Sequence, residues 1–318
     1  MKIAILDDYG NDALRLADWS GLGEVSVFRD TLKEHDELVE RLRLFDVLCV
    51  MRERTPLPGS LLERLPQLKL IVTSGTRNLA IDLDTAQRQG ITVCGTELRK
   101  TTTAELTLAL MLASQRRIVV EASHLAQGHW QQGLGRDLAG LTLGLVGLGK
   151  VGQQVAALAK AFGMQVAAWS QNLTEATCLE HGVTYARSLE ALLGQADIVS
   201  VHLVLSPRSH GLIGREALHH MRPDACLINT SRGPIIDNAA LLQALREGVV
   251  GSAAIDVFEV EPLPNDAPIR DQELIDSGRL LLTPHLGYTS QQTFELFYRQ
   301  MVEDIKAWRD GNPIRQLE

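Results

Sequence analysis

The strongest constraint on the fold is an alternation that runs the length of the chain. Short apolar, β-branched runs alternate with helical patterns from one end to the other. Such alternation is typical of parallel sheets whose strands are joined by crossover helices. With 318 residues the chain exceeds one ordinary hydrophobic core. The sequence therefore predicts two doubly wound α/β domains.

The runs divide into two series. The first predicts strands at 2–7, 24–28, 46–51, 68–73 and 91–94, with helices such as 33–43 and 58–65 between them. The second predicts six strands, at 141–146, 164–169, 197–201, 225–229, 251–255 and 279–282, and a last helix at 290–310 that returns to the first domain.

A helix between the two series begins near Thr102, in "TTTAELTLALMLASQRRI". Its threonines suit a cap, and Glu105 suits the first turn. Because its apolar residues are too continuous for a surface helix, we expect it to be buried between domains or subunits.

Composition and charge argue against nucleic-acid and membrane partners. The net charge is -8 and only 4% of residues are aromatic, whereas nucleic-acid binders usually present basic surfaces. No apolar run reaches the length of a membrane span, and the N-terminus lacks the pattern of a signal peptide. Four widely spaced cysteines without a paired motif indicate reduced, mostly buried thiols: Cys49, Cys94, Cys178 and Cys226. We therefore expect a cytoplasmic protein.

A glycine loop directly follows strand 141–146 and opens a helical run. Gly147 permits a tight turn, Gly149 lets the backbone approach a pyrophosphate, and Gly152 lets helix and strand pack closely. The helix N-terminus offers free N–H groups to the phosphates. The alternative is a glycine-rich turn without a ligand. The residues expected at the cofactor are Gly147, Gly149, Lys150, Val151 and Gly152.

The end of the next strand bears on which cofactor fits. An acidic residue at this place holds the ribose hydroxyls of NAD, but strand 164–169 is followed by Ser170, Gln171 and Asn172. The carboxylate that would repel a 2′-phosphate is missing, and no arginine stands at 171–174 to attract one. Ser170 therefore favours NADP, and the choice between NAD and NADP stays open.

Chemically active residues follow three later strands. If the strand order is 3-2-1-4-5-6, strand 225–229 lies beside strand 141–146, at the edge where ligands bind. Arg232 follows strand 225–229, Glu261 comes after strand 251–255, and His285 follows strand 279–282. We therefore expect an arginine, a carboxylate and a histidine around one crevice.

Hydride transfer to a 2-keto acid needs this set of side chains. A guanidinium can hold the substrate carboxylate and polarise the carbonyl through its forked donors. Imidazole can donate a proton near neutral pH, and a carboxylate beside it fixes the tautomer of the ring. Each residue alone also has a structural reading, since Arg232 could bond loop carbonyls, Glu261 could be a solvated loop charge and His285 could end a strand.

At these residues the sequence resembles the D-isomer-specific 2-hydroxyacid dehydrogenase family. The resemblance rests on "GLVGLGKVG", "VHLVLSPRSHGLIG", "INTSRGPIID", "AIDVFEVEPLP" and "LTPHLGY", and it extends over essentially the whole chain. It implies a Rossmann cofactor domain at 99–289, inserted into a flavodoxin-like substrate domain at 1–98 plus 290–318. It also implies a homodimer, with the helix near Thr102 contributing to the interface.

The resemblance implies roles for residues of the cofactor domain. Arg232 would bind and polarise the substrate, and Glu261 would pair with His285, the acid/base. Asp256 would meet the nicotinamide carboxamide. The cofactor cleft would also be lined by Ser206, Thr230 and Ser231.

In the first domain, "VMRERTP" resembles the family's arginine-bearing loop, which places Arg52 at the substrate and leaves the role of Arg54 open. "TSGTRNLAIDL" lies where the family has its substrate-carboxylate loop, but it departs from the usual glycine-valine-glycine pattern. Gly75 and Thr76 are candidates for substrate binding. Arg77 is either an extra charge for a diacid or phosphorylated acid, or a surface residue.

The predicted reaction is NAD(P)-dependent transfer of a hydride between the nicotinamide and C2 of a small 2-keto or D-2-hydroxy acid, such as glyoxylate or hydroxypyruvate. One alternative is a 3-phosphoglycerate dehydrogenase, which here would lack the regulatory domain that many such enzymes carry. Another is a corepressor-like protein that senses dinucleotides. A formate-type dehydrogenase is disfavoured, because its histidine is usually accompanied by glutamine where this chain has Glu261. No metal site is expected, because His219 and His220 point to different sides of a helix.

Overall fold

The computed structural model describes residues 1–317 and divides the chain into two compact units. The first unit combines Met1–Arg99 with the chain from Thr289 onward, and the second is Lys100–Tyr288. The second unit is therefore a continuous insertion in the sequence of the first. Within residues 1–317, no helix is long and apolar enough to cross a membrane.

The first unit is built on a five-stranded sheet in the order β2-β1-β3-β4-β5, and all its strands are parallel. This is the strand order of flavodoxin-like folds. The strands are β1 (Lys2–Ile5), β2 (Glu24–Val27), β3 (Val47–Val50), β4 (Leu70–Thr73) and β5 (Thr92–Gly95). The helices are α1 (Ala13–Leu16), α2 (His35–Leu42), α3 (Gly59–Leu62), α4 (Leu83–Arg88) and α13 (Gln291–Arg309).

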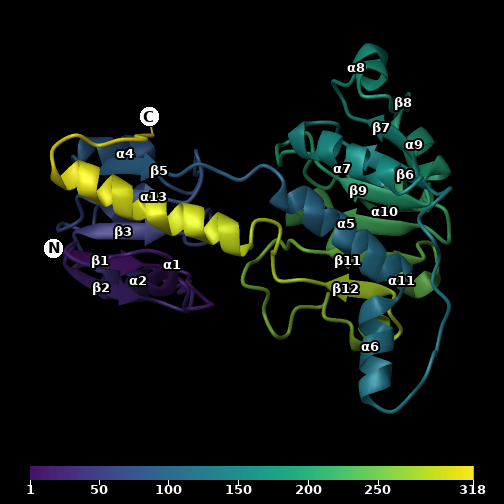
Figure 1. The fold of residues 1–318 in the computed structure, drawn as a ribbon, viewed down its shortest axis with the longest axis horizontal. Coiled ribbons are helices and arrows are strands. Elements are labelled where there is room, and N and C mark those ends of the chain that lie inside the picture. The colour runs from purple at the N-terminus through teal and green to yellow at the C-terminus, as the bar shows by residue number, and fades with distance from the viewer. Residues whose placement is uncertain (318) are drawn as a thin grey trace. The chain divides into compact units, whose positions relative to one another are not determined.

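Helices cover both faces of this sheet. Alternate strand residues, among them Ala4, Leu48 and Ile71, form a core with the buried sides of α2, α3 and α4. The helix α13, yellow in Figure 1, packs on the other face and against α1. The last helix predicted from sequence is thus confirmed as a helix, and it belongs to the first unit.

The chain beyond α13 is anchored in the same unit. Asp304, fully buried on α13, accepts a hydrogen bond from Nε of Arg315 at 2.9 Å. The backbone amide of Leu317 donates to the carbonyl oxygen of Val93 in β5. Burial raises the pKa of Asp304 to about 7, although the charge of Arg315 acts in the opposite direction.

The second unit has a seven-stranded parallel sheet in the order β12-β11-β10-β9-β6-β7-β8. The strands are β6 (Thr142–Val146), β7 (Gln165–Trp169), β8 (Thr184–Tyr185), β9 (Ile198–Val201), β10 (Cys226–Asn229), β11 (Ser252–Ile255) and β12 (Leu280–Leu282). The helices are α5 (Thr102–Gln115), α6 (Ile118–Ala126), α7 (Lys150–Ala161), α8 (Glu175–Glu180), α9 (Leu189–Gln195), α10 (Arg215–His219), α11 (Asn238–Glu247) and α12 (Gln272–Asp276), with a 3-10 turn η1 (Gly233–Ile235).

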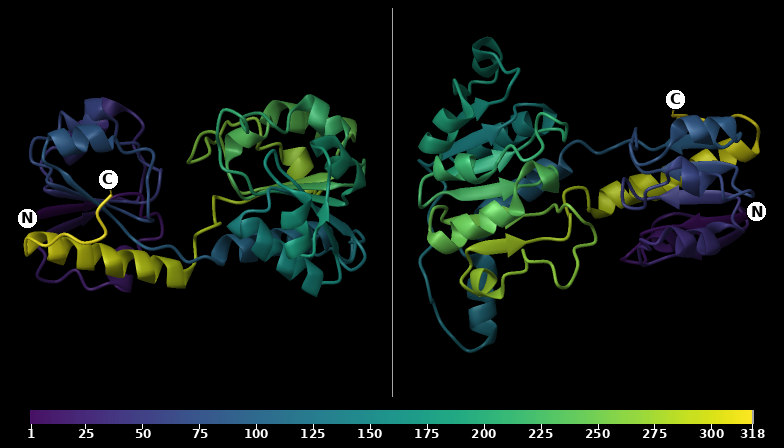
Figure 2. Two further views of the ribbon diagram at one scale, coloured as in Figure 1. Left: turned by 90° about the horizontal axis from the view of Figure 1, so that it is seen from above. Right: turned by 180° about the vertical axis from the view of Figure 1, so that it is seen from behind.

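Strand residues alternate between two cores, one on each face of this sheet. Leu143, Leu145 and Ile228 point into a core that includes buried residues of α5 and α7. Val146, Leu227 and other neighbours in the sequence point into the opposite core, which includes buried residues of α9, α10 and α11. Figure 2 shows helices on both faces. The predicted class of two doubly wound parallel α/β folds is confirmed.

The predicted neighbour of strand 141–146 is wrong. The short strand β8 at Thr184–Tyr185 was not predicted. It lies at one edge of the sheet, next to β7, and takes the place that the predicted order gave to strand 197–201. The strand beside β6 is consequently β9, and the strand 225–229 (β10) pairs with β9 and β11. The carboxyl ends of β10, β11 and β12 still share one edge, because all these strands are parallel.

The helix beginning at Thr102 is shorter than its apolar pattern suggests. It ends at Gln115, Arg117 takes a left-handed backbone conformation with φ of 55°, and a separate helix α6 begins at Ile118. The side chain of Thr101 does not cap α5, although Glu105 lies in the first turn as expected. The buried residues of α5 pack on the sheet of the second unit itself.

Candidate active site

The glycine loop between β6 and α7 has the geometry of an anion-binding turn. Gly147 has a φ of 110°, and a Cβ there would lie 2.6 Å from the carbonyl oxygen of His202. A Cβ at Gly152 would lie 2.3 Å from the carbonyl oxygen of Gly147, so the helix and the loop touch at this point. Only glycine fits either position.

Gly149 differs from its two neighbours in the motif. It is the residue before α7 and has an extended conformation, and a Cβ there would meet nothing within 4 Å. No side chain caps α7, so the amides of its first turn are left for a ligand. Lys150 and Val151 are the first helical residues, and Lys150 is exposed. Open space before uncapped amides fits the pyrophosphate of a dinucleotide.

The three polar residues expected in the cofactor cleft contact other protein groups. Thr230 is buried, and its hydroxyl lies 2.9 Å from that of Thr107 on α5. The Ser231 hydroxyl donates to the carbonyl oxygen of Leu203. Ser206 begins a turn in which its amide donates to the Ser209 hydroxyl at 2.8 Å. These bonds tie the loops after β9 and β10 together and to α5.

Glu261 and His285 are joined by a hydrogen bond on the edge formed by β11 and β12. Oε2 of Glu261 lies 2.6 Å from Nδ1 of His285, and both side chains are largely buried. The other carboxylate oxygen, Oε1, accepts a hydrogen bond from the backbone amide of Phe258 at 2.8 Å. Both oxygens of Glu261 therefore have a hydrogen-bond partner in the protein. Because Nδ1 of His285 faces the carboxylate, Nε2 is the ring nitrogen that faces away from it.

Backbone strain also marks His285, whose φ is 54°. Positive φ is uncommon for residues other than glycine, and it persists where surrounding contacts hold it in place. The ring of Tyr288 packs edge-on against the imidazole, with centroids 5.3 Å apart. The imidazole is thus fixed by its backbone, by a carboxylate and by an aromatic ring.

Asp256 positions the loop that carries His285. It is fully buried, and its Oδ1 accepts hydrogen bonds from the Thr283 hydroxyl at 2.6 Å and from the Leu286 amide at 2.7 Å. Its Oδ2 accepts from the Gly287 amide at 2.9 Å. Burial raises the pKa of Asp256, while these hydrogen bonds lower it. A carboxylate is the acceptor that such a set of donors requires.

Arg232 lies at the start of η1, directly beyond β10. Its side chain is half-buried, and Nη1 donates to the carbonyl oxygen of Ser231 at 2.8 Å. The buried Asn229 holds this turn, because its Nδ2 donates to the Arg232 carbonyl oxygen and its Oδ1 accepts from the Ser231 amide. A Cβ at Gly233 would lie 2.1 Å from the Phe258 carbonyl carbon, so the Arg232 turn packs directly on the segment that leads to Glu261.

Sequence reasoning missed both Asn229 and Gly233 as site residues. Each stands inside the segment "INTSRGP", but nothing in the local pattern distinguishes an asparagine that holds a turn from one that simply ends a strand. The close approach of Gly233 to Phe258 depends on two segments that are far apart in sequence.

In the first unit, Arg52 and Gly75 lie together beyond β3 and β4. Arg52 has a φ of 53°, and a Cβ at Gly75 would lie 2.0 Å from Nη1 of Arg52. Asn78 joins the two loops, since its Nδ2 donates to the Arg52 carbonyl oxygen at 2.6 Å and to the Thr73 hydroxyl at 2.9 Å. Asn78 is thus a positioning residue whose role the sequence does not reveal, because there it is only part of a departure from the family pattern.

The other candidates of this unit differ in exposure. Thr76 and Arg77 are exposed, whereas Arg54 is half-buried and its charge acts on the buried Asp7. Asp7 has a raised pKa because of burial, and it accepts hydrogen bonds from the hydroxyls of Thr31 and Thr55. Arg54 therefore has a partner of opposite charge within its own unit.

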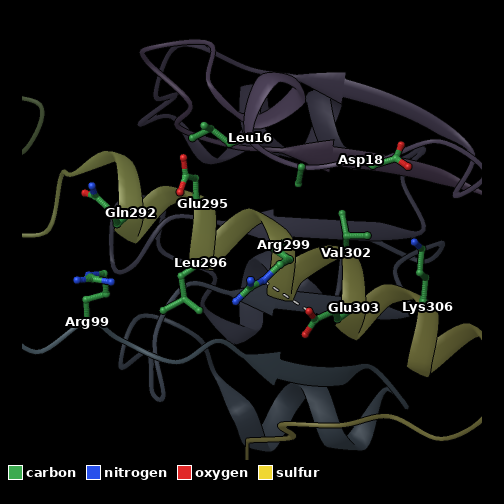
Figure 3. Close-up of a pocket in the computed structure, with 11 residues that line it drawn as sticks. Leu16, Asp18, Arg99, Gln292, Glu295, Leu296, Arg299, Val302, Glu303 and Lys306 are labelled. Carbon is green, nitrogen blue, oxygen red and sulfur yellow. Dashed lines mark ion pairs between the residues drawn. The ribbon is translucent and has the colours of Figure 1, made fainter.

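Two cavities lie apart from these side chains. One of about 730 Å³ runs along α13 in the first unit, and Figure 3 shows basic and acidic side chains interspersed around it, including Arg299 and Glu303 with 3.7 Å between their charged atoms. The other, of about 630 Å³, lies in the second unit beside Phe258 and Glu259. Neither is lined by a residue that the sequence predicted to bind cofactor or substrate.

Comparison with known proteins identifies the family of the chain. The sequence model of the family described as D-isomer specific 2-hydroxyacid dehydrogenase, NAD binding domain, matches residues 108–287. The chain belongs to the D-isomer specific 2-hydroxyacid dehydrogenase family. The resemblance found in the sequence is thereby confirmed, and with it an NAD-binding domain.

Individual relatives of this dehydrogenase family member cover most of the chain. It is 35% identical to D-3-phosphoglycerate dehydrogenase of Methanocaldococcus jannaschii over 96% of this chain and 57% of that protein. It is 34% identical to glycerate dehydrogenase of Methylorubrum extorquens over 89% of this chain and 88% of the relative. The crystal structure of phosphoglycerate oxidoreductase from Vibrio cholerae superposes with a TM-score of 0.90 at 35% identity, covering 98% of this chain and 99% of the other.

Proposed function

We propose that the protein is an NAD(P)-dependent reductase of a small 2-keto acid, which in the reverse direction oxidises the corresponding D-2-hydroxy acid. The observation that carries the proposal is the directed Glu261–His285 pair, in the same unit as an open glycine loop. The pair favours a reductase over a protein that only senses dinucleotides, because proton transfer requires a histidine with a defined tautomer. The second unit is accordingly the proposed cofactor domain, and the first the proposed substrate domain.

The proposed mechanism assigns one task to each side chain. When bound at the glycine loop, a nicotinamide dinucleotide would supply the hydride that reduces C2 of the keto acid. Arg232 binds the substrate carboxylate and polarises the C2 carbonyl through its forked donors. His285 donates a proton from Nε2 to the carbonyl oxygen, because Nδ1 is held by Glu261. In the oxidative direction the same nitrogen accepts the proton of the hydroxyl.

Asp256 acts in this mechanism through the backbone that it holds. It accepts hydrogen bonds from the backbone amides of Leu286 and Gly287, the two residues that follow His285. Any contact with the nicotinamide carboxamide, as the family resemblance implies, would be additional to these bonds. Ser170, Ser206, Thr230 and Ser231 are proposed as the remaining cofactor-binding residues.

The substrate proposed is a small acid of the glyoxylate and hydroxypyruvate type or its phosphorylated relative. The names of the two relatives, glycerate dehydrogenase and D-3-phosphoglycerate dehydrogenase, favour three-carbon acids. Arg52, Gly75 and Thr76 are the proposed substrate-binding residues of the first unit. The exposed Arg77 would serve only a substrate with a second negative charge.

A homodimer is proposed for the assembly. Large apolar side chains are exposed on α6 and on the segment after it, where water is an unfavourable neighbour. Their exposed fractions are 53% for Ile118, 54% for Val119, 58% for Leu125, 73% for Trp130 and 97% for Leu134. A second copy of the chain that covered this surface would account for them. The cytoplasmic location expected from the sequence stays a prediction.

The proposal is tested by initial rates with NADH and NADPH against glyoxylate, hydroxypyruvate, pyruvate, oxaloacetate and 3-phosphohydroxypyruvate. We expect turnover of at least one acid, and a drop of about 10² to 10⁴-fold in His285→Ala with the dissociation constant for NADH unchanged. Tight dinucleotide binding without turnover of any acid would favour the sensing alternative. Turnover that survives His285→Ala would remove this residue from the mechanism.

A further inference from the structure

The second unit holds an uncompensated arginine beside the end of β7, where a dinucleotide's adenosine ribose is recognised in this fold. Two backbone contacts locate the place. The Gly147 amide donates to the carbonyl oxygen of Trp169 at 2.8 Å, so the glycine loop and the end of β7 are joined. Ser170, the next residue, is half-buried, and no acidic residue occurs before Glu175.

A hydrogen bond brings Arg208 to this place from 37 residues further along the chain. The Gln171 side chain donates from Nε2 to the carbonyl oxygen of Arg208 at 3.1 Å. The turn that carries Arg208 is stiff, because the buried Ser209 hydroxyl donates to the Val204 carbonyl oxygen at 2.7 Å and accepts from the Ser206 amide. Arg208 therefore projects from a fixed turn, which is a better base for recognition than a mobile loop.

The charge of Arg208 is available. Its side chain is exposed, and within residues 1–317 its guanidinium has no ion pair or hydrogen bond. No arginine occurs among residues 171–174, but the turn after β9 brings Arg208 beside Gln171.

We propose that Arg208 and Ser170 form a subsite for the 2′-phosphate of NADP(H). The guanidinium would make charge-assisted hydrogen bonds to the phosphate, and the serine hydroxyl would add one more without the repulsion of a carboxylate. The inference rests on the proposed dinucleotide binding and adds the identity of the preferred cofactor. Arg187 is a competing candidate, because the pairing of Ala168 with Tyr185 places it on the same edge, but among residues 1–317 no hydrogen bond links its loop to Gln171.

The test measures dissociation constants directly. Nicotinamide fluorescence reports the binding of NADPH and NADH, and calorimetry reports the binding of adenosine 2′,5′-bisphosphate. We expect the unaltered protein to bind NADPH more tightly than NADH. Arg208→Ala should weaken NADPH and the bisphosphate by about 10- to 100-fold, equivalent to about 1.4 to 2.8 kcal/mol, and NADH by less than about twofold. Ser170→Asp should weaken NADPH and spare NADH.

Arg215→Ala is the matched control, since it removes the same charge from an exposed position on α10. Tighter binding of NADH than of NADPH by the unaltered protein would overturn the inference. An Arg208→Ala variant that keeps its NADPH affinity would also overturn it, as would an equal loss in Arg187→Ala or Arg215→Ala. If neither dinucleotide binds, the proposed function itself fails. If NADH binds well and Arg208 has no effect, the function stands and only the subsite is refuted.

Discussion

Replacing either of two glycines of the phosphate loop by alanine is expected to weaken dinucleotide binding, but for different reasons. A Cβ at Gly152 would lie 2.3 Å from the carbonyl oxygen of Gly147, whereas a Cβ at Gly149 would meet nothing within 4 Å. Gly152→Ala therefore forces the helix α7 and the loop apart. Gly149→Ala leaves the fold as it is and fills only the space in which a pyrophosphate would lie.

The size of the first effect follows from the distance. A carbon atom normally approaches a carbonyl oxygen to about 3.3 Å, so the backbone at Gly152 must move by roughly 1 Å. Overpacking of this kind costs about 1–3 kcal/mol, which corresponds to a fall in Tm of about 2–12 °C for a domain of this size. Gly149 has a φ of -77°, which alanine adopts without strain, and its substitution should change stability by less than about 0.5 kcal/mol.

Thermal melts of both variants without cofactor, with NADH titrations beside them, separate the two cases. We expect both to bind NADH at least about tenfold more weakly, a loss of about 1.4 kcal/mol or more, and only Gly152→Ala to melt lower. The reasoning is refuted if Gly152→Ala retains both its Tm and its affinity. It is also refuted if Gly149→Ala binds NADH as well as the unaltered protein does.

Arg232→Lys should lower kcat/KM for keto-acid reduction by about 100-fold or more at unchanged NADH affinity, because lysine lacks the fork; initial rates check this, and near-normal turnover would contradict it. Reduction takes up the proton that His285 is proposed to donate and oxidation releases one, so reduction should fall and oxidation rise with increasing pH; identical pH profiles in both directions would exclude His285 as the acid/base. Asp304, whose pKa is raised from 3.8 to about 7, holds its proton only in the folded state between these values. The free energy of unfolding should therefore fall from about pH 4 to pH 7, by on the order of 4 kcal/mol. Urea unfolding of Asp304→Asn should lack this fall, and an unchanged slope would refute the assignment.

Strand ends could be predicted from the sequence because they depend on local patterns. Apolar runs mark the ends of β10, β11 and β12, so the sequence alone places the residues beyond them on one edge of the sheet. The two-residue strand β8 has no such run, and its omission misplaced the neighbour of β6. A short strand on the sheet edge depends on pairing with β7 rather than on its own composition.

Residues that hold loops together could not be predicted in the same way. Asn78, Asn229 and Gly233 each act on a segment that only the folded chain brings near. Arg208 illustrates the same limit, because two strands, β8 and β9, lie between it and its partner Gln171 along the chain. The break at Arg117 had no signal of its own, since neither glycine nor proline marks it.

The backbone amide of Phe258 determines the direction of the hydrogen bond between residue 261 and His285. Replacing Glu261 by the isosteric glutamine would reverse that direction. Because that N–H donates to one oxygen of Glu261, a glutamine at this position would have to keep its oxygen there and turn its NH₂ group toward Nδ1 of His285. The ring nitrogen would then have to accept a hydrogen bond instead of donating one, and the neutral ring would carry its proton on Nε2. A single backbone amide, three residues from the carboxylate, thus determines which nitrogen of the histidine is protonated in Glu261→Gln.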